Sequence, residues 1–598
     1  MARSFRLPMK EEDLTLLNRT GLKDLQRARR NLELLTTKGI HGEAFGALLP
    51  SFLEALKNAP DPDMALNNFE RYAEAVVDRG FFYSLLKENR KILDLALTIF
   101  GSSQCLSDLL IRFPHDFYWL LEPGVLRKPR PKEELEADLS ASLAWVSSFE
   151  GKLGALRRFK ARELLRIGLQ DLLGNLDLVG VTQELSNLAD VSLQKAYEIC
   201  SGELKRRYGI PQSLDEEGQL RECRFAVIGM GKLGGSELNF SSDIDLLFVY
   251  EAEGETTGIR TPSGESSGKI TNKQFFVRLG ELLIKAIGEV TSDGRVFRVD
   301  MRLRPEGQAG DLALSINAYQ LYYGSYGREW ERLALIKARP VAGDPELGQA
   351  FLEMVTPFVY RKSLDFGALA EIRALKEKIN LSVALEGKIY RDVKLGYGGI
   401  REVEFVVQAF QLLYGGRDPW IREPNTLRAL HRLSERGYLS YDDYDALAKA
   451  YTFLRTVEHR LQILHQLQTH TLPEDRRELT RLARRLGYRG EDPATSFLQE
   501  LKAHTEAVRR IYESLLRESP GEEGFMPSYS GETPPLQLFF EADFPLEQIR
   551  ECLSGVGFKD VERALRGFLA LRDGPPFVHY SPESRRALAK LVPKLLQA

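Results

Sequence analysis

Apolar side chains recur every three or four positions over both ends of this chain. In the first 205 residues, the spacing is clearest over 85–99 and 164–173. Beyond residue 345 it returns over 371–385, 400–414, 441–467 and 496–516. Because an α-helix repeats every 3.6 residues, such a stripe covers one face of a helix. The pattern predicts packed helical bundles on both sides of a central region.

A different pattern begins near residue 222. Short apolar runs over 225–228 and 246–250, and an alternating run over 296–303, predict three β-strands. Residues 254–268 are rich in Gly, Ser and Thr, which predicts a mobile loop. Residues 275–290 then have the spacing of an amphipathic helix. We therefore expect a mainly α chain in which one α/β domain is flanked by helical bundle domains.

These changes of pattern divide the chain into five predicted parts. Pro520-Gly521 and Pro534-Pro535 lie in a stretch crowded with helix breakers, which is typical of a linker. The parts are an N-terminal helical domain over 1–205, an α/β domain over 206–345, a second helical domain over 346–517, a linker over 518–536 and a small C-terminal helical unit over 537–598.

Composition argues against several classes of protein. Of 598 residues, 82 are Lys or Arg and 85 are Asp or Glu, and the net charge of −3 disfavours a general nucleic-acid binder. The four cysteines form no Cys-x-x-Cys pair, so neither a zinc site nor a disulfide framework is indicated. No uncharged apolar run reaches the ~18 residues of a membrane span, and the N-terminus lacks the apolar region of a signal peptide. We expect a soluble cytoplasmic protein.

Two aspartates at the start of the second predicted strand are the first candidates for chemistry. Asp243 and Asp245 are two positions apart, so in a strand both carboxylates lie on one face. Ile244 and Leu246 then point the other way, into a core. Neighbouring carboxylates repel unless a cation lies between them, and Mg²⁺ prefers oxygen ligands. The pair predicts a magnesium site; the alternative is a polar strand start with two capping aspartates.

A third aspartate belongs to the alternating run. In Arg298-Val-Asp300-Met-Arg302-Leu-Arg304 the even positions are polar, so one strand face would present Asp300 among three arginines. Taken alone, an exposed sheet face has the same pattern. Beside the carboxylate pair, it predicts a third metal ligand surrounded by guanidinium groups that bind phosphate. Three carboxylates and two Mg²⁺ ions form a clamp suited to in-line attack at phosphorus.

The glycines before the carboxylate pair match several phosphate-binding patterns in part. A Gly-x-Gly-x-x-Gly sequence ends at Gly234, but only eight residues separate it from Asp243, too few for the crossover helix of a dinucleotide-binding unit. Residues 263–269 resemble a P-loop with Ser263 in place of its first glycine, and the chain has no His-Arg-Asp kinase loop. What remains is a glycine-rich turn whose backbone N–H groups could bind phosphate at a helix start.

A glycine-rich turn, a short helix and then Asp-x-Asp resemble the polymerase-β-like nucleotidyltransferase superfamily. Longer motifs give a closer resemblance, to the glutamine synthetase adenylyltransferase/adenylyl-removing enzyme family. These motifs follow one another over nearly the whole chain, at 88–123, 231–246, 299–307, 327–339 and 392–405.

That family modifies a tyrosine of glutamine synthetase. Full-length members contain two nucleotidyltransferase halves. One half attaches AMP from ATP, and the other removes AMP by phosphorolysis, which consumes phosphate and releases ADP. This chain has one such half, and residues 237–245 and 328–332 are more similar to the N-terminal, AMP-removing half. The resemblance therefore implies phosphorolytic removal of AMP. The alternatives are ATP-dependent adenylyl transfer to glutamine synthetase, transfer to another substrate such as the PII signal protein, or a non-catalytic module that binds glutamine synthetase or PII.

The resemblance also implies roles for individual residues. The catalytic metal ligands, with two Mg²⁺ ions, would be Asp243, Asp245 and Asp300. The residues that bind nucleotide or phosphate would be Gly234, Gly235, Ser242, Arg302, Arg304 and Lys337.

Three further features leave alternatives open. Lys337 could be a phosphate ligand or a solvated surface lysine. Glycines 396–399 favour a helix-start turn over a second phosphate loop. The spacing of His459, His465 and His470 does not place all three on one helical face, which disfavours a metal cluster there.

Overall fold

The structure is a computed structural model, and it describes most of the chain. The described residues are 17, 20–37, 41–126, 129–215, 217–260, 266–362, 390–465, 467–517, 550, 554 and 560–573. The chain divides into two compact units. The first comprises residues 1–366, 391–394 and 398–512, and the second comprises 367–390, 395–397 and 513–598.

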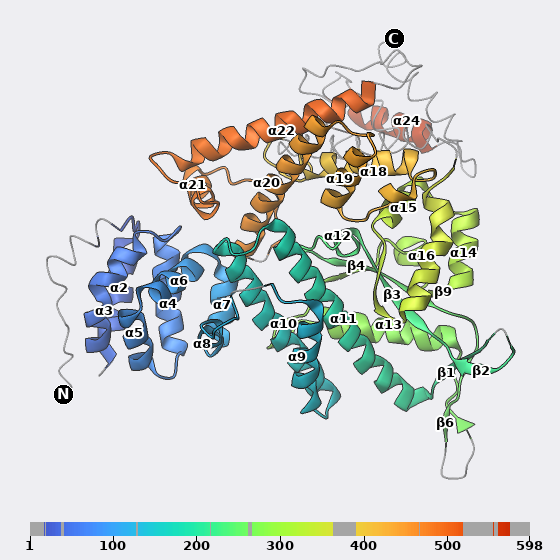
Figure 1. Cartoon of the computed structure of the whole chain (residues 1–598), viewed down its shortest axis with the longest axis horizontal. Coiled ribbons are helices and arrows are strands. Elements are labelled where there is room, and N and C mark those ends of the chain that lie inside the picture. The colour runs from blue at the N-terminus through green and yellow to red at the C-terminus, as the bar shows by residue number, and fades with distance from the viewer. Residues whose placement is uncertain are drawn as a thin grey trace. The chain divides into compact units, whose positions relative to one another are not determined.

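Helices form the first part of the first unit (Figure 1). They are α2 (Leu25–Thr37), α3 (His41–Leu56), α4 (Pro62–Ala75), α5 (Arg79–Glu88), α6 (Arg90–Ser102), α7 (Gln104–Arg112), α8 (Asp116–Leu120), α9 (Lys132–Ala144), α10 (Phe149–Leu172) and α11 (Leu178–Tyr208).

The short helices α4 to α7 begin at polar caps. The side chains of Asp61, Asp78, Asn89 and Ser103 each accept a hydrogen bond from a backbone N–H in the first turn. These N–H groups have no partner inside the helix, so a capping oxygen stabilises the helix start by ~1 kcal/mol. The caps explain why this apolar region folds as several short helices and not as one long helix.

The α/β part follows, and its elements alternate with loops. They are β1 (Pro211–Leu214), β2 (Leu220–Glu222), β3 (Phe225–Met230), α12 (Gly231–Gly234), β4 (Ile244–Tyr250), β5 (Glu255–Thr256), β6 (Ile259–Arg260), β7 (Ser266–Ser267), α13 (Asn272–Gly288), β8 (Val299–Asp300), the 3₁₀ turn η1 (Gly307–Ala309), β9 (Ala313–Ser315), α14 (Ile316–Ser325), α15 (Glu329–Ile336) and β10 (Arg339–Gly343).

The central sheet has the strand order β10-β3-β4-β8, and β9 also pairs with β4. Strand β3 is antiparallel to β10 and β4, whereas β8 and β9 are parallel to β4. All six residues of β3 are buried, which fits its continuous apolar run. Two smaller groups of strands, β2-β1-β5 and β6-β7, lie outside this sheet.

A second set of helices completes the first unit. It consists of α16 (Pro345–Val359), α18 (Ile400–Tyr414), the 3₁₀ turn η2 (Pro419–Ile421), α19 (Thr426–Glu435), α20 (Tyr441–His465), α21 (Arg476–Arg485) and α22 (Pro493–Arg517), the last of which continues into the second unit. In the second unit the described parts include α24 (Val561–Asp573) and an ion pair between Arg550 and Glu562.

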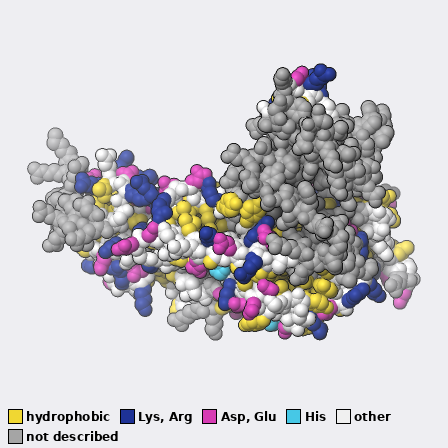
Figure 2. Space-filling view, turned by 90° about the horizontal axis from the view of Figure 1, so that it is seen from above, with side chains coloured by type: hydrophobic (Ala, Val, Ile, Leu, Met, Phe, Trp, Pro, Cys, Tyr) yellow, Lys and Arg dark blue, Asp and Glu magenta, His cyan; other side chains and the backbone are white. Residues whose placement is uncertain are grey.

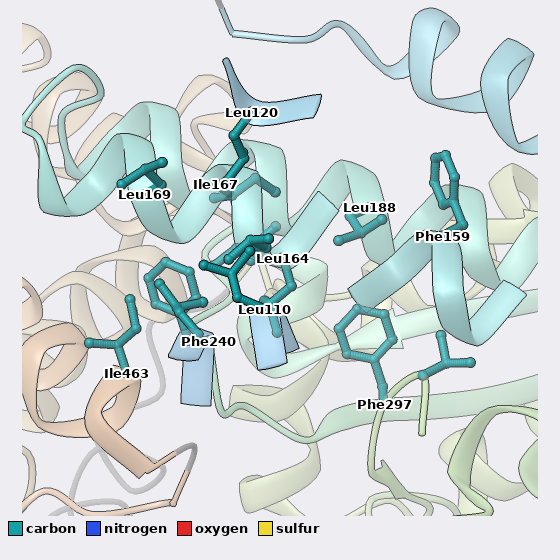
Figure 3. Close-up of a cluster of buried hydrophobic side chains, with 14 of the residues drawn as sticks. Leu110, Leu120, Phe159, Leu164, Ile167, Leu169, Leu188, Phe240, Phe297 and Ile463 are labelled. Atoms are coloured by element: carbon teal, nitrogen blue, oxygen red, sulfur yellow. The ribbon is translucent and has the colours of Figure 1, made fainter. Parts of the chain in front are cut away.

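One apolar core joins the helices before and after the sheet to the sheet itself. Figure 3 shows Leu164 of α10, Leu188 of α11, Phe240 and Phe297 of the α/β part and Ile463 of α20 in one cluster. The Ser103 hydroxyl also donates a hydrogen bond to the Ile463 carbonyl at 2.5 Å, although 360 positions separate them. The helical parts and the sheet are therefore packed into a single body.

The periodicity predicts most of these elements correctly. The mainly helical content with one α/β region is confirmed, as are the helices at 275–290, 400–414, 441–467 and 496–516, to within three residues at each end. The predicted helix 371–385 and linker 518–536 lie outside the described residues, as does most of 537–598. The five domain boundaries stay predictions.

Two predictions in the α/β part are wrong in detail. The region 254–268 is not one loop, because it contains β5, β6 and β7 around residues outside the described set. The strand predicted over 296–303 pairs only at Val299 and Asp300. After Asp300 the chain turns, because the Asp300 carboxylate accepts the N–H of Arg302 at 2.8 Å. The alternation beyond residue 300 therefore reflects a turn and not a pleated strand.

Among the residues that the structure describes, no helix is long and apolar enough to cross a membrane. The described part of the face in Figure 2 shows basic and acidic side chains interspersed, in keeping with the nearly balanced charge of the sequence.

Helices α10 and α11 share a buried charge cluster that periodicity does not reveal. Arg166 is completely buried and pairs with Glu163, at 2.7 Å, and with Glu184. Its Nη1 also donates to Gln170 at 2.6 Å. A buried charge of this kind is tolerated because every polar group has a partner.

We expect Arg166→Ala to lower the free energy of unfolding by about 3 kcal/mol, because it removes the cation paired with buried Glu184 and one of the two arginines paired with buried Glu163. The control is Arg158→Ala, whose half-exposed side chain pairs with Asp293 and should contribute less than ~1 kcal/mol. Chemical denaturation of both variants measures the difference. Equal losses would contradict the assignment of α10–α11 stability to the buried cluster.

Candidate active site

The three predicted aspartates lie at one edge of the central sheet. Strands β4 and β8 run parallel, and their register places Asp245 directly opposite Asp300. Paired residues on adjacent strands point to the same face. Asp243 immediately precedes β4, two positions before Asp245. The predicted convergence of these carboxylates is therefore present in the fold, although β8 is only two residues long.

Asp245 is the aspartate of this set whose ionisation is opposed by its surroundings. Burial raises its pKa to about 7, and the negative charges of Asp300 and Asp243 add to the shift. The pKa of Asp300 is instead lowered, mainly by its hydrogen bond from Arg302. A carboxyl group whose ionisation is opposed in this way favours a bound cation beside it.

The nearby arginines neutralise the other two aspartates. Arg298 donates from Nε to Asp243 and from Nη2 to the Ser241 carbonyl. Arg302 donates to the Asp300 carboxylate, with Nη2 at 2.6 Å from Oδ2. The Arg304 guanidinium donates to the carbonyls of Met301, Gln308 and Gly310, and its predicted phosphate contact stays a prediction.

Arg304 was expected beside phosphate on the same strand face as Arg302. The chain turn after Asp300 removes that shared face, so Arg304 holds the loop that follows β8. Arg298 and Arg302 remain at the site, each bonded to one carboxylate.

The glycine-rich turn lies beside Asp245. Strand β3 ends at Met230, opposite Asp245, and the single-turn helix α12 follows. Gly231 has a φ of +54°, and a side chain there would meet the Asp245 carboxylate at 2.8 Å. At Gly234 a Cβ would lie 1.6 Å from the Lys337 carbonyl. Both positions therefore require glycine, one for its conformation and one for close approach.

Part of the predicted phosphate cradle is already used inside this turn. The N–H of Gly235 donates to the Gly231 carbonyl, and the N–H of Ser236 donates to the Leu233 carbonyl. The Ser242 hydroxyl accepts the N–H of Asn239 at 3.1 Å. The turn is a rigid platform in this structure, and the predicted phosphate contacts of Gly234, Gly235 and Ser242 stay predictions.

Lys337 is neither a surface lysine nor an open phosphate ligand. Its ammonium donates to Glu237 at 2.8 Å, to Thr426 at 3.0 Å and to Glu404 at 3.2 Å. Three acceptors use all three donors of an ammonium group. Burial alone would lower the pKa of Lys337, but Glu237 and Glu404 raise it overall. Lys337 thus joins the turn to α18 and the start of α19.

A second lysine makes a similar connection to α20. Lys232, within the turn, lies 3.0 Å and 3.1 Å from the two carboxylate oxygens of buried Glu458. Burial lowers the pKa of Lys232 to about 7, against the opposing effect of Glu458. Glu458 also accepts a hydrogen bond from Asn239 at 2.6 Å. The turn is therefore held from both sides by helices that follow it in the sequence.

The histidines take part in this framework. His459 Nε2 lies 2.8 Å from the Asn239 side-chain oxygen, and burial lowers the pKa of His459 to about 3, so the ring is neutral. His470 Nδ1 lies 2.9 Å from Glu458. Both residues position the segment before Asp243.

Sequence reasoning missed the acidic partners of this framework. Glu237, Glu404 and Glu458 are buried, and each meets a lysine from a distant part of the chain. The resemblance to family motifs could have pointed to two of these residues, because Glu237 lies in the motif at 231–246 and Glu404 lies in the motif at 392–405.

The donor set at the sheet edge suits a hard divalent cation. Carboxylate oxygens are the ligands that Mg²⁺ prefers. Within the described ranges, no group of three or more Asp, Glu, His or Cys side chains is arranged to hold a metal ion. Asp243 and Asp300 each accept hydrogen bonds from an arginine, whereas Asp245 pairs with no arginine among the residues that the structure describes. Metal ligation by Asp243 and Asp300 would therefore replace guanidinium partners with the cation.

The glycines at 396–399 form the predicted helix-start turn. Gly399 is the N-cap of α18, and Gly398 has a φ of +67°. A Cβ on Gly398 would lie 1.9 Å from the Thr505 carbonyl, so the turn packs closely against α22.

Comparisons with known proteins agree with the motifs. Residues 93–354 match the family model of glutamate-ammonia ligase adenylyltransferase, and residues 373–516 match that of GlnD PII-uridylyltransferase. The chain is 39% identical over 501 residues to the bifunctional glutamine synthetase adenylyltransferase/adenylyl-removing enzyme of Thioalkalivibrio sulfidiphilus. The aligned region covers 84% of this chain and 50% of that protein.

Other relatives of the same name give similar values. The protein of Nitrosococcus oceani is 37% identical over 89% of this chain and 53% of its own length, and that of Pseudomonas putida is 38% identical over 83% and 49%. The chain thus spans about half the length of the curated relatives it matches. These matches confirm the resemblance predicted from the motifs: over most of its length, the chain is similar to members of the glutamine synthetase adenylyltransferase/adenylyl-removing enzyme family.

Proposed function

We propose that this chain is a Mg²⁺-dependent nucleotidyltransferase with a polymerase-β-like catalytic sheet. Its substrate would be glutamine synthetase carrying AMP on a tyrosine, and its reaction the phosphorolytic removal of AMP to give ADP. The observation that carries the proposal is the meeting of three carboxylates beside the glycine-rich turn, with Asp245 opposed in its ionisation by the other two. The names of the relatives support glutamine synthetase as the substrate and the transfer or removal of an adenylyl group as the chemistry.

In this proposal Asp243, Asp245 and Asp300 would hold two Mg²⁺ ions. When bound, these ions would supply charge neutralisation and orientation of phosphate oxygens. Arg298 and Arg302 would then be released from their carboxylates to contact the anionic substrate, and guanidinium groups suit that task. The turn at Gly231–Gly234 would fix the distance between the substrate phosphate and Asp245.

The direction of the reaction rests on sequence resemblance. Residues 237–245 and 328–332 are more similar to the AMP-removing half of the family. ATP-dependent attachment of AMP is the second candidate, since the relatives carry both activities in their name. The match of residues 373–516 to the PII-uridylyltransferase model favours PII as a possible regulatory partner.

The first test is turnover. Adenylylated glutamine synthetase, inorganic phosphate and Mg²⁺ should yield ADP, and Asp245→Asn should reduce the rate at least ~1,000-fold because it removes a central metal ligand. Asp445→Asn, a change to an exposed α20 side chain paired with Lys449, should leave the rate unchanged.

Parallel assays with ATP and unmodified glutamine synthetase test the direction. AMP attachment that needs Asp245, without phosphate-dependent release, would show that the chain works in the opposite direction. Activity that survives Asp245→Asn in either assay would refute the metal-carboxylate mechanism.

The second test is stability without metal. The pKa of folded Asp245 is about 7, above its ordinary value of 3.8, so ionisation opposes folding and wild-type stability falls as pH rises from 3.8 through 7. Asp245→Asn should therefore be more stable than wild type by about 4 kcal/mol at pH 8 in EDTA, with a gap that closes toward pH 4.

Thermal unfolding measures this difference, with Asp445→Asn as the control that should follow wild type at every pH. Mg²⁺ should raise the Tm of wild type and have little effect on Asp245→Asn. A stability gap that is the same at pH 4 and pH 8 would contradict the electrostatic account of the site.

A further inference from the structure

The cations at the candidate site are nearly all engaged by protein groups. Arg298 and Arg302 bind carboxylates, Arg304 binds carbonyls, and Lys232 and Lys337 bind buried glutamates. A substrate phosphate would therefore compete with an existing partner for each of them. A cation with open donors beside the carboxylates would avoid that competition.

Lys394 is such a cation. Within the described part of the chain, its ammonium takes part in no hydrogen bond and no ion pair, and its side chain is partly exposed. Its charge nevertheless lowers the pKa of Asp245, Glu404 and Glu458, and of Lys232 as well. Its charge therefore acts on Asp245, on Lys232 of the glycine-rich turn and on the two glutamates.

The backbone around Lys394 is fixed on this side of the molecule. The N–H of buried Val393 donates to the His470 carbonyl at 2.9 Å, and the Val393 carbonyl accepts the N–H of Ile400 at 3.0 Å. The Lys394 carbonyl accepts the N–H of Arg401 at 3.0 Å, at the start of α18. Three hydrogen bonds therefore hold this segment between His470 and α18.

The same anchor is connected to the glycine-rich turn. The His470 ring lies 2.9 Å from Glu458, and Glu458 holds Lys232 of the turn at 3.0 Å. The backbone of Lys394 is thus separated from the turn by a short series of buried contacts. Lys394 follows Asp245 by almost 150 positions in the chain.

We propose that Lys394 binds the substrate phosphate, by donating a hydrogen bond to a non-bridging oxygen of the nucleotide or of inorganic phosphate. This assignment rests on the proposed function. The carboxylates themselves would be covered by Mg²⁺, so the natural partner of the open ammonium is the anion that the metal brings in. Lysine serves as a compact point charge for phosphate in such sites.

In phosphorolysis, an oxygen of inorganic phosphate forms a bond to the phosphorus of AMP, and the bond from that phosphorus to the tyrosine oxygen breaks. The released phenolate takes up one proton, and ADP is the second product. Lys394 offsets negative charge on the phosphoryl oxygens.

Calorimetric titration of the full chain with Mg·ADP and with adenosine tests this role. Lys394→Met keeps the length of the side chain without its charge and should weaken Mg·ADP binding about 10- to 100-fold, with adenosine binding unchanged. Lys394→Arg should recover part of the affinity. The matched control is Lys449→Met, which removes an exposed lysine of α20 and should bind Mg·ADP as wild type does.

Several results would overturn the assignment. They are wild-type affinity for Mg·ADP in Lys394→Met, equal losses for Mg·ADP and adenosine, and a wild-type chain that binds Mg·ADP no better than adenosine. If Lys394→Met unfolds, as judged by its Tm, Lys394→Gln replaces it in the same comparison. If Mg·ADP binding depends on the Lys394 charge but glutamine synthetase is not turned over, the role of Lys394 is supported and the proposed substrate is refuted. If glutamine synthetase is turned over and Lys394→Met binds Mg·ADP as wild type does, only the role of Lys394 is refuted.

Discussion

Two lysines, Lys337 buried and Lys232 partly buried, hold the glycine-rich turn, and the arrangement of the candidate site depends on them. Lys232 meets Glu458 of α20, and Lys337 meets Glu237 and Glu404. Each pair is desolvated, so loss of either partner leaves a charge in the core without compensation. The pairs therefore specify one arrangement of the sheet edge against the later helices. Without that arrangement, Gly231 would not lie against the Asp245 carboxylate.

The aspartates show a different kind of electrostatic balance. Two of them accept hydrogen bonds from arginines, whereas burial and the charges of Asp300 and Asp243 oppose the ionisation of Asp245 more strongly than nearby cations favour it. Perturbed carboxyl groups in a cleft are typical of sites that bind metals or transfer protons. The paired lysines therefore belong to the structural framework, whereas Asp245 is the candidate for chemistry.

The sequence predicts local features of the site better than distant ones. Asp245 lies in β4 as the local pattern predicts, although Asp243 immediately precedes that strand, and apolar periodicity finds helices such as 400–414 because it repeats within each helix. The position of Lys337 was not predictable from its own helix, since its three partners come from Glu237, Glu404 and Thr426. The strand predicted beyond Asp300 was wrong for a related reason: a turn made by the Asp300 side chain interrupts the alternation.

The contact between Lys232 and Glu458 spans 226 positions in the chain. During synthesis, the glycine-rich turn therefore leaves the ribosome long before α20 is made. Until then Lys232 has water as its partner, and the sheet edge cannot take its final form. Long-range pairing of this kind slows folding, since loop-closure entropy is lost before the contact forms. The nascent chain thus reaches a competent site only after translation has passed the second set of helices.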